Sequence, residues 1–165
     1  MGPASGEQGD SAISGGGIGG LALGAGLRRR GFEVAVFDRD TDVAATGGYH
    51  ITLDERAQSA LKDLVEPKIM QRLLASGSAL RLRERDAFWD RRGRLLGYGP
   101  DLGDSASIDV DRITLRMLLA EAVGDGLHLG CNVSGVGPDG KRGAALSVAP
   151  DRMHGWRSTT RYAIP

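Results

Sequence analysis

The order of apolar, glycine and polar positions between residues 11 and 38 predicts a strand, a helix and a second strand. A short apolar run at 12–13 leads into a glycine-rich segment, and a helical stretch then ends at Gly31. A second apolar run follows over 32–37 and stops at Asp38. Gly31 follows three arginines, whose cations suit a helix C-terminus, and is placed as a left-handed cap. The segment therefore predicts a βαβ unit within a parallel sheet.

The rest of the chain combines helical periodicity with short strand-like runs. Asp54 and Asp111 are placed as helix N-caps, and Pro67 can open a helix. The character changes over 79–98, which predicts two strands joined by a turn at 91–93, an antiparallel insertion. The other predicted elements are strands at 49–53, 127–136 and 144–148, and helices at 55–64, from 67 to about 77, and at 112–123. The fold class is therefore α/β, with about three parallel strands.

The glycine-rich segment SGGGIGG has the spacing of a dinucleotide-binding turn. Gly15 permits a tight turn, Gly17 lets the backbone approach a pyrophosphate, and Gly20 lets the helix pack closely on the strand. The N–H groups at the helix start face the phosphates. Asp38 can accept hydrogen bonds from the adenosine ribose, and its charge disfavours a 2′-phosphate. The segment predicts binding of the ADP half of a dinucleotide; the alternative is a glycine-rich loop in an ordinary βαβ unit.

Arg112 occupies the first position of the helix predicted after Asp111. A cation there opposes the helix dipole. Either this arginine points to solvent, or it reaches an anion such as a pyrophosphate. The residue types alone leave these two interpretations equally open.

Composition narrows the function classes further. The chain has 165 residues, with 21 Lys and Arg against 21 Asp and Glu, so neither nucleic acid nor a membrane surface is implied as a partner. Cys131 is the only cysteine, which excludes an internal disulfide and favours a cytoplasmic location. The three histidines show no metal-ligand spacing. The apolar run at 13–27 is too short to span a bilayer, and its arginines follow it, unlike those of a secretory signal.

Four segments together give the chain a resemblance to the FAD-dependent monooxygenases of the aromatic hydroxylase type. They are GGGIGGLALGAGLRRRG, VAVFDR, GGYHITLDERAQSALKDL and DVDRITLRMLLAEAV, in that family's order. The resemblance implies an incomplete Rossmann-like FAD/NAD(P)-binding fold with an antiparallel β insertion. It also implies FAD as cofactor, NAD(P)H as co-substrate and hydroxylation of a small organic substrate.

The resemblance also assigns site residues. It implies that Asp38 binds the adenosine ribose, where the family more often has Glu, and that Arg39 lies along the adenine. Arg112 would approach the pyrophosphate or the ribityl chain. Tyr49 and His50 lie toward the flavin and substrate side and receive no role. The complete set of expected cofactor-binding residues is Gly15, Gly17, Ile18, Gly20, Asp38, Arg39 and Arg112; no catalytic residue is assigned.

The resemblance is clear over 12–136 and extends at most to 148. The family's later flavin motifs and its substrate-binding sheet are not found in the sequence, which suggests a truncated or frame-shifted product. The predicted organisation is a disordered lead-in at 1–10, a partial FAD-binding domain at 11–148 and an irregular basic tail at 149–165. Exposed apolar surface then predicts self-association or a completing second chain. A stand-alone ADP- or NAD-binding module and an inactive truncated gene product remain as alternatives.

Overall fold

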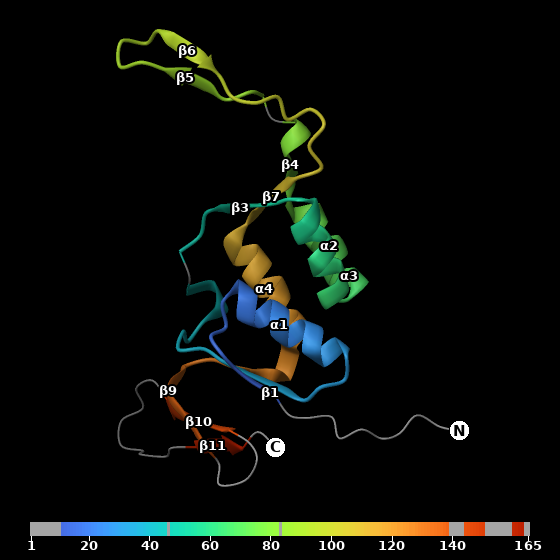
Figure 1. Ribbon diagram of the computed structural model, residues 1–165, viewed down its shortest axis with the longest axis vertical. Coiled ribbons are helices and arrows are strands. Elements are labelled where there is room, and N and C mark those ends of the chain that lie inside the picture. The colour runs from blue at the N-terminus through green and yellow to red at the C-terminus, as the bar shows by residue number, and fades with distance from the viewer. Residues whose placement is uncertain (1–10, 46, 83, 139–143, 151–159, 164–165) are drawn as a thin grey trace, which may run out of the picture.

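The computed structural model describes residues 11–45, 47–82, 84–138, 144–150 and 160–163 (Figure 1). The predicted lead-in at 1–10 lies outside these residues, as do 151–159 and 164–165 of the predicted tail. The division of the chain into domains stays a prediction.

A short parallel sheet supports the N-terminal βαβ unit. It contains β1 (Ser11–Ser14), β2 (Val34–Phe37) and β8 (Leu127–His128), all parallel, in the order β1-β2-β8. Helix α1 (Ile18–Arg29) connects β1 to β2, as the hydrophobic pattern predicts. The α/β class and the Rossmann-like arrangement are thereby confirmed.

Helix α1 packs unusually closely because it is rich in glycine. A Cβ on Gly24 would lie 2.8 Å from Cγ2 of Val36 and 3.3 Å from Cγ2 of Val123. Glycine at this position therefore lets the helix approach both β2 and helix α4 (Arg112–Val123), which begins after the N-cap Asp111. Val36 and Val123 both belong to the main hydrophobic core, so this close contact lies within it. Figure 1 shows α1 and α4 crossing in the middle of the molecule.

A second, antiparallel sheet lies on the other side of the helices. It has the order β3-β7-β4, formed by β3 (His50–Leu53), β7 (Ile108–Asp111) and β4 (Ser78–Ala79). Helices α2 (Glu55–Leu64) and α3 (Pro67–Ser76) connect β3 to β4 and start and end where the caps predict. Strand β7 had no counterpart in the sequence interpretation. Short 3-10 helices complete this part of the chain: η1 (Val43–Ala45), η2 (Leu80–Leu82) and η3 (Gly124–Gly126).

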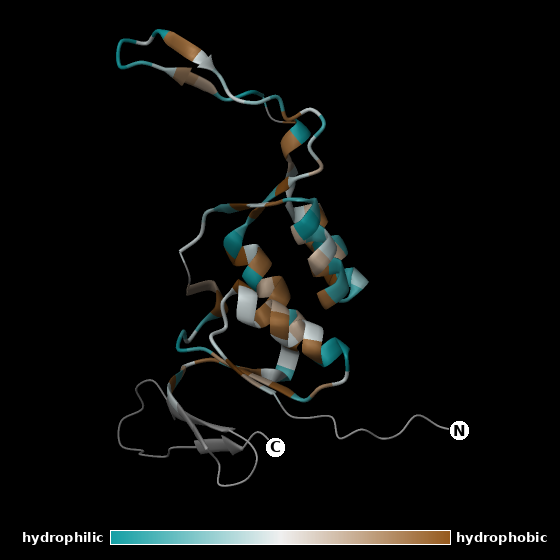
Figure 2. Ribbon diagram, viewed as in Figure 1, coloured by the Kyte–Doolittle hydropathy of each residue, from teal (hydrophilic) through white to brown (hydrophobic). Residues whose placement is uncertain are grey.

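The predicted antiparallel insertion is an extended hairpin of β5 (Ala87–Trp89) and β6 (Leu95–Tyr98). It projects from the end of the molecule beyond β4 and β7 (Figure 1). Figure 2 shows apolar residues along both of its strands, and the large side chains there are exposed. The turn contains Gly93 at φ +74°, within the predicted 91–93. The first predicted strand is wrong over 80–82, where the chain forms η2, and over 84–86, which lie in no strand.

The strand predicted at 127–136 is divided in two. Gly130 takes φ +66°, a conformation that breaks a strand, and separates β8 from β9 (Cys131–Pro138). Strand β9 leaves the parallel sheet and pairs with β10 (Ala144–Pro150), which confirms the strand predicted at 144–148. Strand β11 (Thr160–Ala163) pairs with the other edge of β10. The irregular tail predicted at 149–165 is therefore wrong for Thr160–Ala163. Strand β10 offers these residues backbone partners, which their composition does not reveal.

No helix among the described residues combines the length and apolar character needed to cross a bilayer.

Candidate functional site

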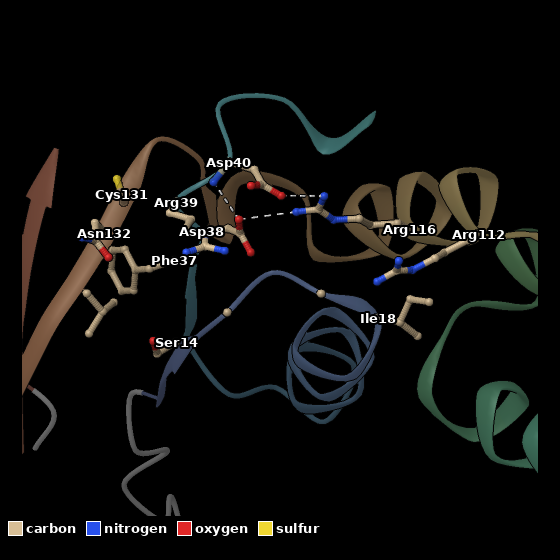
Figure 3. A pocket seen from close by; sticks show the side chains of 13 residues that line it. Ser14, Ile18, Phe37, Asp38, Arg39, Asp40, Arg112, Arg116, Cys131 and Asn132 are labelled. Carbon is tan, nitrogen blue, oxygen red and sulfur yellow. Dashed lines mark hydrogen bonds and ion pairs between the residues drawn. The ribbon is translucent and has the colours of Figure 1, made fainter. Parts of the chain in front are cut away.

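A cavity of about 290 Å³ opens at the carboxyl ends of β1 and β2. Ligands of open parallel α/β sheets bind at this edge. Figure 3 shows the cavity between the glycine turn, the end of β2, the start of β9 and helix α4. Its lining consists of Ser14, Gly15, Gly17, Ile18, Phe37, Asp38, Arg39, Asp40, Arg112, Arg116, Cys131, Asn132 and Val133.

The glycine turn has the geometry that the sequence predicts. Gly15 takes φ +105°, which other residues rarely adopt, and so turns the chain out of β1. Gly17 is the exposed N-cap of α1, and a Cβ there would meet nothing within 4 Å. A ligand could therefore reach the backbone at this position. Gly20 is the one expected site residue outside the cavity lining; it packs against the carbonyl oxygen of Gly15 instead.

Asp38 is fixed at the end of β2 by its main chain. Its N–H donates to the carbonyl of His128 over 2.9 Å, and its carbonyl accepts from the N–H of Cys131 over 2.8 Å. The ring of the preceding residue, Phe37, stacks on that of His128, with centroids 5.1 Å apart. These contacts hold the carboxylate at the border of the cavity.

The Asp38 side chain turns toward the glycine turn. Oδ2 accepts from the N–H of Gly16 over 2.5 Å, and Oδ1 accepts from the N–H of Asp40 over 2.8 Å. Only 11% of the side chain is exposed. The carboxylate therefore links the two segments that a nucleotide would contact.

The two arginines expected at the site lie on opposite sides of the cavity. Arg39 is exposed at the end of β2. Nη1 of Arg112 donates to the carbonyl of Gly47 over 3.3 Å, and its guanidinium lies 5.8 Å from the ring centroid of Tyr49. Arg112 thus lines the cavity, and its contact with an anion stays a prediction. His50 does not line the cavity.

The start of α4 is reinforced by a capping carboxylate. Asp111 accepts a hydrogen bond of 2.8 Å from the N–H of Thr114. This bond is the main reason that the pKa of Asp111 lies below its usual value. The cap therefore fixes the helix end from which Arg112 projects.

Two charged residues of the cavity were missed by the sequence interpretation. Arg116 is 4% exposed, and its Nη1 donates to Oδ2 of Asp40 over 2.9 Å. A signal for Arg116 did exist, because it follows Arg112 by one helical turn and so lies on the same face. Asp40 gave no comparable signal. Among the described residues, no three His, Cys, Asp or Glu side chains are grouped to hold a metal ion.

Known proteins resemble this chain in sequence. Residues 13–57 match the family described as NAD(P)-binding Rossmann-like domain. The chain is 31% identical over 121 residues to zeaxanthin epoxidase of Oryza sativa, and 33% identical over 136 residues to aurachin C monooxygenase/isomerase of Stigmatella aurantiaca. These matches cover 68% and 78% of the chain but only 18% and 34% of those proteins. The chain therefore spans at most about a third of the length of these curated relatives.

Solved structures show the same fold. A putative FAD-containing monooxygenase from Photorhabdus luminescens has a TM-score of 0.73 at 17% identity, with 94% of this chain and 37% of that one covered. The flavin-dependent monooxygenase PieE, solved with FAD and substrate, also has a TM-score of 0.73, at 22% identity, with 93% and 28% covered. The relatives of this chain are thus monooxygenases, and the chain shares the fold of the Rossmann-like portion of flavin-dependent monooxygenases.

Proposed function

We propose that the chain binds the ADP half of FAD in the cavity at the carboxyl ends of β1 and β2. The observation that carries this proposal is the convergence of three features on one cavity: the open helix start at Gly17, the carboxylate of Asp38 and the guanidinium of Arg112. Backbone N–H groups and a cation suit a pyrophosphate, and a carboxylate suits a ribose diol.

The cavity lies at the lower end of the size range of small-molecule sites. Such sites commonly measure about 300–1,000 Å³, and this one has about 290 Å³. In this proposal Gly15, Gly17 and Ile18 border the pyrophosphate, and Gly20 allows the turn to form. Arg112 approaches the phosphates, Asp38 the ribose and Arg39 the adenine. The carboxylates of Asp38 and Asp40 disfavour a 2′-phosphate.

The activity of a whole protein containing this portion is part of the same proposal. Bound FAD would supply electron transfer from NAD(P)H and reaction with dioxygen, for the hydroxylation of a small organic substrate. The residues described here position the cofactor, and we assign no proton transfer to any of them. We further propose that residues 11–148 form the cofactor-binding unit and that the protein acts in the cytoplasm.

A stand-alone module for NAD or another ADP-containing ligand is the second candidate function. The match of residues 13–57 to the NAD(P)-binding Rossmann-like domain favours it. The cavity chemistry is compatible with both candidates, because FAD and NAD share the ADP half.

The two candidates are distinguished by titrating the chain with FAD, NAD and ADP, using flavin fluorescence and calorimetry. FAD binding clearly tighter than ADP binding supports the flavin site. Equal affinities for all three ligands favour the nucleotide module. A folded chain that binds none of them overturns both.

Variants locate the binding to the cavity. Asp38→Ala and Arg112→Ala should each weaken FAD binding at least about tenfold, the loss of one charge-assisted contact. Arg72→Ala is the matched control, since Arg72 pairs with Glu121 on the surface outside the cavity. Equal affinity in all three variants would place the ligand elsewhere.

A further inference from the structure

Arg116 joins three segments that are distant in the sequence. Its Nε donates to the carbonyl of Gly16 over 2.9 Å and its Nη1 to Oδ2 of Asp40 over 2.9 Å. Its Nη2 lies 3.5 Å from Oδ1 of Asp38. Figure 3 shows the guanidinium extending from α4 toward both carboxylates. One side chain thus connects α4, the glycine turn and the loop after β2.

The contacts around Gly16 form a closed ring. Its N–H donates to Asp38, its carbonyl accepts from Arg116, and Arg116 approaches the same carboxylate of Asp38. Gly16 is buried, and a Cβ there would lie 2.8 Å from Cβ of Asp38. Both polar backbone groups of Gly16 are therefore hydrogen-bonded, which fixes the middle of the glycine turn.

The ring also reduces the repulsion expected between the cavity's carboxylates and an anionic ligand. Asp38 and Asp40 both line the cavity in which we place a diphosphate. Two carboxylates would repel an anionic ligand and each other, most strongly where water is partly excluded. Arg116 brings a permanent positive charge to both of them. A guanidinium that is 4% exposed is stable there because carboxylates and a carbonyl occupy its donors.

We propose that Arg116 is a positioning residue that partly neutralises the Asp38–Asp40 pair and so permits a diphosphate to bind beside it. This inference rests on the proposed function and deepens it. Arg112 contacts the ligand in this arrangement, whereas Arg116 acts through the two carboxylates and the glycine turn.

The test uses ligands that differ in charge: adenosine, AMP and ADP. Their dissociation constants are measured by ligand-observed NMR and calorimetry for the wild-type chain, Arg116→Met and Arg116→Lys. Arg116→Met should weaken ADP binding about ten- to hundredfold, AMP binding less and adenosine binding least. Arg116→Lys should lie between, because lysine keeps the charge but loses the fork of donors. Circular dichroism and thermal melting establish that each variant is folded, with Arg72→Ala as the control.

A second variant tests neutralisation without altering the buried arginine. Asp40→Asn removes a negative charge from a side chain that is 35% exposed, while the amide oxygen can still accept from Arg116 and Asp38 still pairs with it; thermal melting establishes that this variant is folded. It should tighten ADP binding, leave adenosine binding unchanged, and partly restore ADP binding in the Arg116→Met background.

The possible outcomes distinguish the role proposed for Arg116 from the proposed binding of the ADP half. A wild-type chain that does not bind ADP overturns the proposed function and this inference with it. If the wild type binds ADP, equal weakening of all three ligands by Arg116→Met would show a merely structural arginine and overturn the inference. Unchanged ADP binding in both Arg116→Met and Asp40→Asn would do the same. If Arg116→Met does not fold, tighter ADP binding by Asp40→Asn supports the inference, and unchanged ADP binding overturns it.

Discussion

Gly20 faces the carbonyl oxygen of Gly15 so closely that a Cβ on Gly20 would overlap it. The same Cβ would lie 3.4 Å from Cγ2 of Ile13 in β1. The third glycine of the motif therefore fits the helix against both the turn and the strand.

Gly20→Ala should destabilise the fold because backbone atoms cannot move aside as a flexible side chain can. We expect the free energy of unfolding to fall by about 1–3 kcal/mol, the usual range for overpacking, in urea denaturation. Gly19→Ala is the matched control, since a Cβ on this exposed neighbour meets nothing within 4 Å. It should raise stability by about 0.5–1 kcal/mol through helix propensity. Equal effects at both positions would contradict the close contact.

Asp111 should make the stability of the chain depend on pH in the acid range. The hydrogen bond from Thr114 lowers the pKa of this carboxyl in the folded state, from the usual 3.8. A lowered folded pKa contributes stability above about pH 4, and that contribution is lost as the pH falls through the folded pKa.

Asp111→Asn isolates this contribution, because asparagine can still cap the helix but does not titrate. The stability difference between wild type and variant, from urea unfolding at pH 6 down to pH 2.5, should shrink below about pH 4. A difference that stays constant over this range would show that the charge of Asp111 does not contribute. Asp54→Asn, at the N-cap of α2, serves as a comparison at a second capped helix.

Cys131 should report on occupancy of the cavity. Its side chain is partly exposed and lines the cavity beside Asp38, and it is the chain's only cysteine. A nucleotide bound in the cavity would cover Cys131, so saturating ADP should slow the reaction of its thiol with a modifying reagent severalfold. The control is the urea-unfolded chain, in which ADP should have no effect. Unchanged protection in the Arg112→Ala variant at the same ADP concentration would contradict a shared site.

The β5–β6 hairpin should promote self-association. Leu96 is 69% exposed and Trp89 is 60% exposed, and these residues lie on a projecting hairpin with no other element drawn against it (Figure 2). Replacing both with serine should lower the apparent mass in sedimentation at high concentration and reduce the fluorescence of a bound apolar dye. Met117→Ser, at a position 53% exposed on α4, is the control. A wild-type chain that remains monomeric at all concentrations would contradict the prediction.

Local patterns in the sequence predict the helices, most strands, and the glycine turn and acid that border the cavity. Apolar period and an aspartate cap predicted α2 and α4, and terminal residues such as Gly31 and Pro67 predicted the bounds of α1 and α3, because these signals are local properties. The spacing from Gly15 to Asp38 marked the turn and the acid, since these conformational requirements act within one βαβ unit.

Tertiary structure decided what those residues do together. Arg116 lies in a helix remote in sequence from Asp40 and Gly16, and only the packing of α1 against α4 brings their polar atoms within 2.9 Å. Strand β7 also depends on non-local contacts, because its backbone partners lie in β3 and β4. Charge pairing and strand pairing across distant segments depend on the completed core, and no local pattern of residue types encodes them.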